Sequence, residues 1–192
     1  MGTLVRIRRI DFLIDMLKRV RGKEPRAVLV LVGDAPEQDV QFLRDEARRF
    51  GVDEHVIFTG FVRMERAWGY IRQAKVCLSP FRPSPILDST SPTKVVEYLA
   101  WGRPVVANAH PDQSKVLGES GAGFAVAYDP QAFADAVVEL LRNPAKAEEM
   151  GRRGVEYVRR HRSYAALSWQ LEQKYIELLG KAGRRHSARC AT

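Results

Sequence analysis

Several features of other protein classes are missing from this sequence of 192 residues. It has two cysteines, Cys77 and Cys190, which form no motif, so we expect reduced thiols and a cytoplasmic location. It has no run of about 18 uncharged apolar residues, which excludes a membrane-spanning helix. The first residues lack the apolar core and cleavage site of a signal peptide, so secretion is not expected. No group of Asp, Glu, His and Cys has metal-ligand spacing, and we expect neither a bound metal nor another cofactor.

What is present is the composition of one globular domain, with 45% hydrophobic and 28% charged residues. The net charge of +8 is unevenly placed along the chain. Residues 1–26 carry eight basic and three acidic side chains, residues 151–192 carry ten and three, and residues 27–150 carry thirteen and seventeen. Basic ends of this kind suit a solvated surface, a phosphorylated ligand or peripheral contact with an anionic membrane. No nucleic-acid-binding motif accompanies them, so nucleic acid is not an expected partner.

Apolar periodicity predicts alternating strands and helices. Apolar, β-branched runs predict strands over residues 27–32, 55–59, 76–78, 104–107 and 124–127. Helical spacing predicts helices over residues 10–20, 36–50, 63–72, 92–101, 129–141, 144–161 and 164–179. An irregular loop is expected over 79–90, and a basic, disordered tail over 180–192. The alternation is typical of a doubly wound parallel α/β sheet, in a single domain over residues 1–179.

The segment 91–107 combines a helix start, a helix, a helix end and a strand. Ser91 suits the N-cap position, Pro92 the first helical position and Gly102 the position that closes the helix. Lys94 and Glu97 then lie three residues apart on one face. Free N–H groups, a cation and a carboxylate on one short helix suit an anion that is joined to a polyol.

Topology points to the same place, because ligands of doubly wound sheets bind at the carboxyl ends of the strands. Gly33, Gly60 and Ser79 each follow or end a predicted strand, and the turn before Pro92 lies near the same edge. A ligand site is therefore predicted there from topology alone.

Six segments in order carry a family resemblance: residues 2–8, 30–36, 56–62, 78–80, 94–107 and 121–125. The longest reads Lys-Val-Val-Glu-Tyr-Leu-Ala-Trp-Gly-Arg-Pro-Val-Val-Ala. Together they resemble the C-terminal, nucleotide-sugar-binding domain of the group 1 (family 4) retaining glycosyltransferases, which have GT-B architecture. The resemblance implies a Rossmann-like domain. In the family Gly2 would end the first strand, so we expect the fold to lack that strand, with an unpaired slot or a makeshift strand from residues 3–7.

The resemblance also implies catalytic roles. Arg8 aligns with a lysine that, with an arginine, stabilises the departing diphosphate, and Thr3 stands where that arginine is usual. Arg6 or Arg9 would replace it, or they form a solvated basic face. Lys94 would contact the diphosphate.

Glu97 aligns with the second glutamate of the family's Glu-seven-residues-Glu signature and would accept hydrogen bonds from the ribose hydroxyls. Ser89 occupies the position of the first glutamate, and Asp88 either replaces its sugar contact or is an ordinary loop residue. His55 and His110 are expected to be structural. The expected substrate-binding residues are Gly2, Arg9, Gly33, Gly60, Phe61, Val62, Ser79, Pro80, Asp88, Ser89, Thr90, Ser91, Pro92 and Thr93.

The functional hypothesis is the donor-binding half of a glycosyltransferase that uses a nucleoside-diphosphate sugar. An N-terminal acceptor domain, in the same parent protein or in a separate chain, is the expected partner, and we expect no turnover without it. The alternative is a truncated, non-catalytic module that acts as a scaffold or binds a partner or an anionic surface.

Overall fold

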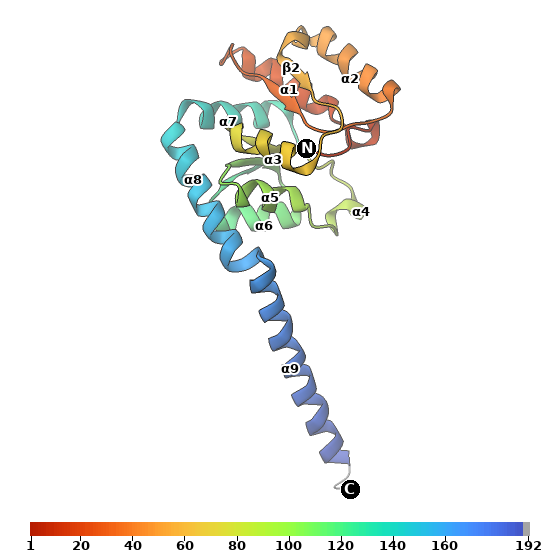
Figure 1. Cartoon of the computed structure of the whole chain (residues 1–192), viewed down its shortest axis with the longest axis vertical. Coiled ribbons are helices and arrows are strands. Elements are labelled where there is room, and N and C mark those ends of the chain that lie inside the picture. Colours follow the sequence, from red (N-terminus) through yellow and green to blue (C-terminus); the bar gives the residue numbers. More distant parts are fainter. Residues whose placement is uncertain (190–192) are drawn as a thin grey trace.

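The computed structural model describes residues 1–189, and in it parallel strands alternate with helices (Figure 1). The strands are β1 (Leu29–Leu31), β2 (Val56–Phe58), β3 (Cys77–Ser79), β4 (Val105–Asn108) and β5 (Gly123–Val126). The main helices of the body are α1 (Asp11–Arg21), α2 (Glu37–Phe50), α3 (Met64–Gln73), α5 (Thr93–Ala100), α6 (Pro111–Ser120), α7 (Pro130–Arg142) and α8 (Pro144–Tyr157). The predicted α/β class is confirmed.

The sheet is interrupted. β1 pairs only with β2, and β3, β4 and β5 form a separate three-stranded sheet, with no ladder between β1 and β3 within residues 1–189. The N-terminal residues run past the end of β1, where the Gly2 N–H donates to the Val32 carbonyl at 2.8 Å and the Leu4 N–H to the Asp34 carbonyl at 3.0 Å. They form no strand, and Arg6–Arg8 is a 3₁₀ turn. The makeshift strand over residues 3–7 is therefore not formed, and within residues 1–189 β1 has no ladder partner other than β2.

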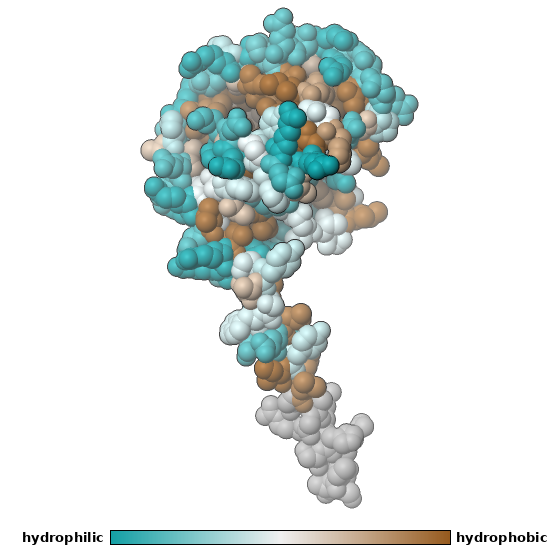
Figure 2. Space-filling view, viewed as in Figure 1, coloured by the Kyte–Doolittle hydropathy of each residue, from teal (hydrophilic) through white to brown (hydrophobic). Residues whose placement is uncertain are grey.

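The C-terminal helix projects away from the α/β domain. After α8, a π-helical turn (Val158–Arg162) leads into α9 (Tyr164–Arg189), which projects away as a long arm (Figure 1). Large apolar side chains are exposed along it (Figure 2), namely Tyr164, Leu167, Trp169, Leu171, Tyr175, Ile176, Leu178 and Leu179. Within residues 1–189 no helix has both the length and the apolarity to cross a membrane.

Helix α9 includes residues that were predicted to belong to a disordered tail. Helix α9 continues past the expected end at Leu179, so the structure differs from the disorder predicted for residues 180–189. Residues 190–192 lie outside the described residues. The boundary between a domain at 1–179 and a tail stays a prediction.

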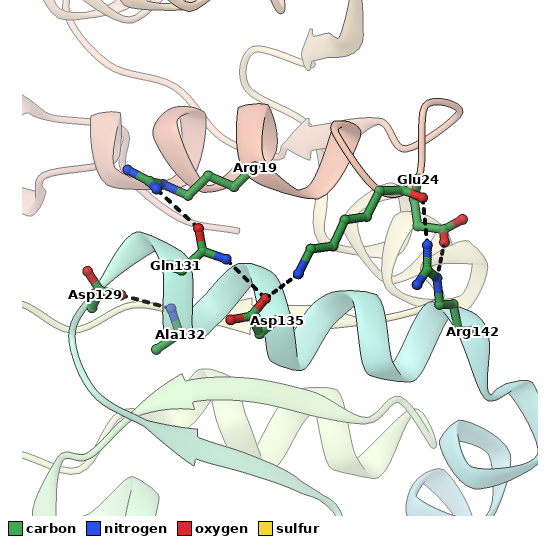
Figure 3. A network of polar contacts seen from close by, with 8 residues as sticks. Arg19, Glu24, Asp129, Gln131, Ala132, Asp135 and Arg142 are labelled. Atoms are coloured by element: carbon green, nitrogen blue, oxygen red, sulfur yellow. Dashed lines mark hydrogen bonds and ion pairs between the residues drawn. The ribbon is translucent and has the colours of Figure 1, made fainter.

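Helices α1 and α7 pack against each other and join the two parts of the sheet. Ile14 of α1 and Phe133 of α7 are fully buried, in one core cluster with β1 and with Val106 of β4. Polar contacts also join the two helices at the surface, among them Arg19 Nη1 to Gln131 Oε1 at 3.1 Å (Figure 3). Just after α1, Lys23 forms an ion pair with Asp135 of α7, with 2.7 Å between Nζ and Oδ1. Because exposed ion pairs contribute about 0–1 kcal/mol each while a buried Phe contributes about 1.5–3 kcal/mol, the apolar contacts supply most of the joint.

The helix that carries Lys94 and Glu97 packs closely on α8. A Cβ atom added at Gly151 of α8 would lie 2.2 Å from the Gly102 carbonyl oxygen, so the backbones touch there. Val95 and Leu99 are buried on α5, Tyr98 is buried at 3% exposure, and Ala100 is exposed. The buried face of α5 therefore includes Tyr98.

Two helices were not predicted. Helix α6 follows β4 directly, and a short helix α4 (Pro85–Asp88) interrupts the loop that was expected to be irregular. Pro111 in the first turn and Gly121 at the end, with φ of 60°, mark the bounds of α6. Few apolar residues lie between these bounds, so the periodicity is weak.

Candidate functional site

Backbone turns form one wall of the site, at the carboxyl ends of β1 and β2. Gly33 pairs with Gly60 in an isolated bridge, and the Gly33 N–H donates to Thr59 Oγ1 at 3.3 Å. Gly33 has φ of 140°, and a Cβ atom there would lie 1.8 Å from the Gly2 carbonyl oxygen. Only glycine fits this position. The predicted glycines Gly2, Gly33 and Gly60 are therefore brought together.

Lys94 faces this wall from the first turn of α5. A Cβ atom added at Gly2 would lie 3.1 Å from Lys94 Nζ, so the ammonium group stands next to the Gly2 backbone. Burial, and then the nearby charge of Arg8, lower the pKa of Lys94. Arg8 itself is exposed at the end of the turn Arg6–Arg8. Within residues 1–189 the Lys94 ammonium group has no hydrogen-bond or ion-pair partner.

Glu97 lies one turn further along α5 and is half-buried. Its carboxylate forms no hydrogen bond or ion pair with any residue in the described part of the chain, Lys94 included. Partly buried charges without partners are unfavourable unless something compensates them. The pair therefore presents one positive and one negative group to whatever approaches α5.

The predicted cap of α5 is wrong. The helix begins at Thr93 with Pro92 as the flanking residue, and no side chain caps it. Ser91 donates its hydroxyl to Asp112 Oδ2 at 2.7 Å and so does not bond the helix N-terminus. The first N–H groups of α5 are thus left without a side-chain acceptor, which favours a bound anion.

The loop before α5 supplies fewer side chains than expected. Ser79 is buried at 3% exposure and donates to Gln113 Oε1 at 2.5 Å, so its hydroxyl points into the core. Ser89 and Thr90 donate to the carbonyls of Ile86 and Leu87. The neighbouring Asp88 ends α4, is exposed, and forms no side-chain hydrogen bond within residues 1–189.

The family follows from the comparison with known proteins. Residues 1–143 match the family model described as glycosyl transferases group 1. The chain belongs to this family. It is 29% identical to a GDP-mannose-dependent alpha-(1-6)-phosphatidylinositol monomannoside mannosyltransferase of Mycolicibacterium smegmatis. The two sequences align over 184 residues, which make up 94% of this chain and 46% of that protein.

Solved structures agree with a half-length glycosyltransferase domain. The fold matches HepE of Anabaena in complex with UDP and glucose with a TM-score of 0.76 at 20% identity, over 91% of this chain and 47% of that one. It also matches the C-terminal domain of the group 1 glycosyltransferase LpcC of Francisella tularensis, with a TM-score of 0.70 at 17% identity, over 85% and 84% of the two chains. The chain spans about half the length of the mycobacterial mannosyltransferase and of HepE.

The three N-terminal arginines of this glycosyltransferase domain do not all lie close to Lys94. Arg9 forms an ion pair with Asp11 at 3.0 Å and lines a separate cavity of about 240 Å³, and the Arg6 guanidinium stacks on the Phe42 ring at 4.0 Å. Of the three arginines, Arg8 is the one whose charge acts on Lys94.

The other predicted contacts surround the wall and α5. Phe61 is 81% exposed beside Gly60. Val62 and Pro80 are half-buried, Pro92 is buried and Thr93 is exposed.

His110, which was expected to be structural, and several side chains that were not predicted hold the loop in place. His110, buried as a structural residue, lies with Nε2 2.9 Å from the Leu87 carbonyl oxygen, and Asn108 accepts from the Phe81 N–H at 2.6 Å. Both precede α6, and Asp112 and Gln113 lie in its first turn. Because α6 was not predicted, nothing in the sequence pattern placed these residues at the site.

Across residues 1–189, no group of three or more His, Cys, Asp or Glu side chains could hold a metal ion.

Proposed function

We propose that this chain is the donor-binding half of a glycosyltransferase and binds a nucleoside-diphosphate sugar between the glycine wall and α5. The observation that carries the proposal is the pair Lys94 and Glu97, both partly buried and both without a hydrogen bond or ion pair in the described chain. A ligand with an anionic and a hydroxyl-rich part would satisfy both groups. The UDP bound by the structurally similar HepE supports this class of ligand.

The diphosphate would lie at the start of α5. Arg8 and Lys94 supply positive charge, and the uncapped N–H groups from Thr93 onward supply donors. Because Gly33 has no side chain, the Gly2 backbone packs against it, and this brings Gly2 beside the Lys94 ammonium group. During transfer, these groups would stabilise the charge that develops on the leaving diphosphate.

The two ends of the ligand would extend to either side. Glu97 would accept hydrogen bonds from the ribose hydroxyls. The exposed Phe61 ring, with Gly60 and Val62, would frame the base. The backbone of Ser79 and the ring of Pro80 would lie beside the diphosphate.

The sugar would contact the loop before α5. Asp88, with Ser89 and Thr90 beside it, would face the sugar. Arg9 would take part only if its ion pair with Asp11 opened.

Turnover would require an N-terminal acceptor domain, from the same parent protein or from a separate chain. Two observations support such a partner: the chain spans about half of its relatives, and α9 exposes a row of large apolar side chains that includes Trp169 and Leu171. The name of the mycobacterial relative includes the lipid phosphatidylinositol monomannoside. A lipid of this kind would suit peripheral contact with an anionic membrane through the basic C-terminal region of this chain. We expect this chain alone to bind the donor without transferring sugar.

Calorimetric titration with UDP, GDP and ADP tests the proposal. Lys94→Ala and Glu97→Ala should each weaken binding about 10- to 100-fold, as expected for loss of a charge-assisted hydrogen bond of about 1.5–3 kcal/mol. Lys115→Ala and Glu65→Ala, which remove exposed charges on α6 and α3, serve as matched controls. If none of the three nucleotides bound to a sample with native circular dichroism, the proposal would fail.

A non-catalytic role is the second candidate. It is favoured by Thr3 in place of an arginine and by Ser89 in place of a glutamate, since the Ser89 hydroxyl is bonded to the Ile86 carbonyl. This candidate predicts retention on anionic vesicles that falls with salt, without nucleotide binding.

A further inference from the structure

A chain of polar contacts links the base of the α9 arm to the start of the site helix. Ser91 Oγ donates to Asp112 Oδ2 at 2.7 Å, and Arg162 Nη2 donates to Asp112 Oδ1 at 3.1 Å. Ser91 lies two residues before α5, and Arg162 ends the turn Val158–Arg162 that precedes α9. The Asp112 carboxylate is therefore shared between two distant segments.

This carboxylate is better shielded than those of neighbouring helix-surface pairs. The side chains of Asp112 and Arg162 are 20% and 23% exposed, whereas those of Arg159 and Glu156 in the same region are 73% and 40% exposed. The first pair joins residues far apart in the sequence, and the second joins residues three apart. A shielded, long-range pair fixes the geometry of its members more firmly than an exposed pair does.

Asp112 stands on a fixed support. It lies in the first turn of α6, between His110 and Gln113, which are buried at 2% and 0% exposure. His110 contacts the Leu87 carbonyl, and Gln113 accepts from Ser79. The start of α6 is thus anchored to the loop that leads to Ser91.

The local sequence would by itself place the Ser91 hydroxyl elsewhere. If α5 began one residue earlier, at Pro92, Ser91 would occupy its N-cap position, where a serine side chain bonds the free N–H groups of the helix. These are the N–H groups that the proposed diphosphate would use. In the structure the Asp112 carboxylate accepts the hydroxyl, and α5 has no side-chain cap.

We propose that Asp112 is a positioning residue for nucleotide binding: it keeps the Ser91 hydroxyl away from the N-terminus of α5, and Arg162 holds the carboxylate in place. Without Asp112, α5 would begin at Pro92, and Ser91 would cap it and compete with the phosphates. The inference rests on the proposed function of α5. It also couples the position of the α9 arm to the donor site through Arg162.

A double-mutant cycle of Asp112 and Ser91 tests the proposal. The measured quantity is the affinity for the nucleotide that binds best to the unmodified chain. Asp112→Ala should lower the affinity about fivefold, the equivalent of a typical N-cap interaction. The same substitution in the Ser91→Ala background should change the affinity by less than twofold, because no hydroxyl remains to compete. Equal losses in both backgrounds, or no loss in either, would overturn the proposal.

Arg162 provides a second arm of the experiment. Arg162→Ala should weaken binding in the same direction as Asp112→Ala, and Arg162→Lys should restore it because the ion pair can re-form. Arg159→Ala removes an exposed pair in the same turn and is the matched control. An equal effect of Arg159→Ala and Arg162→Ala would contradict a specific role for Asp112.

Amide hydrogen exchange separates failure of this inference from failure of the proposed function. Asp112→Ala should slow exchange at Thr93 and Lys94 when Ser91 is present, and should not slow it in the Ser91→Ala background. If no nucleotide bound but this pattern appeared, the positioning role would stand and the donor-binding proposal would fall. If nucleotide bound and the pattern was absent, the positioning role would fall alone.

Discussion

Replacing Gly151 by Ala tests the contact that seats the site helix on α8. In an unhindered helix interior, Gly→Ala stabilises a protein by about 0.4–1 kcal/mol, because alanine has the higher helix propensity and restricts the unfolded chain. At Gly151 the new Cβ atom would lie 2.2 Å from the Gly102 carbonyl oxygen, whereas ordinary contacts begin at 3.4 Å. Helix α8 would have to move by more than 1 Å, given the difference between those two distances.

The two effects oppose each other, and the structure decides which is larger. Overpacking costs about 1–3 kcal/mol, and the upper part of that range applies because a backbone atom is struck. We therefore expect Gly151→Ala to lower the free energy of unfolding by about 1–2 kcal/mol after the propensity gain is subtracted.

Gly69→Ala is the matched control for this substitution. Gly69 lies inside α3, and a Cβ atom there would meet nothing within 4 Å. This variant should be more stable than the unmodified chain by about 0.4–1 kcal/mol.

Urea unfolding followed by circular dichroism gives both free energies under one set of conditions. The expected order of midpoints is Gly69→Ala, then the unmodified chain, then Gly151→Ala. Equal stabilisation by the two substitutions would show that α8 does not contact the Gly102 backbone.

Two further predictions concern titrating groups. Burial and the Arg8 charge lower the pKa of Lys94, so nucleotide affinity should decline as alkaline pH removes the ammonium proton, at a lower pH than for an ordinary lysine. Titration with ADP should show this decline, and Lys94→Arg should abolish it because arginine stays charged; an unchanged decline in that variant would assign it to another group. Burial raises the pKa of Cys77 to about 12, so in a Cys190→Ser variant the remaining thiol should react slowly with Ellman's reagent at pH 8 and rapidly after unfolding. Rapid reaction of the folded variant would contradict the buried position.

Features with local causes were predictable from the sequence. The apolar run before Gly33 forms β1, Gly51 ends α2 with φ of 67°, and Asp129 accepts a hydrogen bond from the Ala132 N–H at 2.8 Å at the start of α7. Each depends on a few neighbouring residues, through β propensity, the left-handed conformation of glycine or a side-chain cap. The resemblance to the family likewise rests on short local segments.

Features decided by distant contacts were not predictable. Ser91 has the residue type of a cap, but Asp112, from a helix that the pattern did not reveal, accepts its hydroxyl. Ser79 has the position of a site residue, but Gln113 holds its hydroxyl in the core. In both cases tertiary partners outweigh a local preference that contributes about 1 kcal/mol.

The interrupted sheet has a consequence for how the molecule opens. In the described part of the chain, the strands β1 and β2 share ladder hydrogen bonds with each other and not with β3. They and α2 therefore connect to the remainder mainly through side chains of α1 and α7. A unit joined by side-chain packing alone separates at a lower free energy than one joined by a backbone ladder. We expect such partial unfolding to remove the Gly33–Gly60 wall while α5, on the other unit, keeps its fold. The proposed donor site therefore spans the boundary between these two units, and a ligand that contacts both of them would hold them together as it binds.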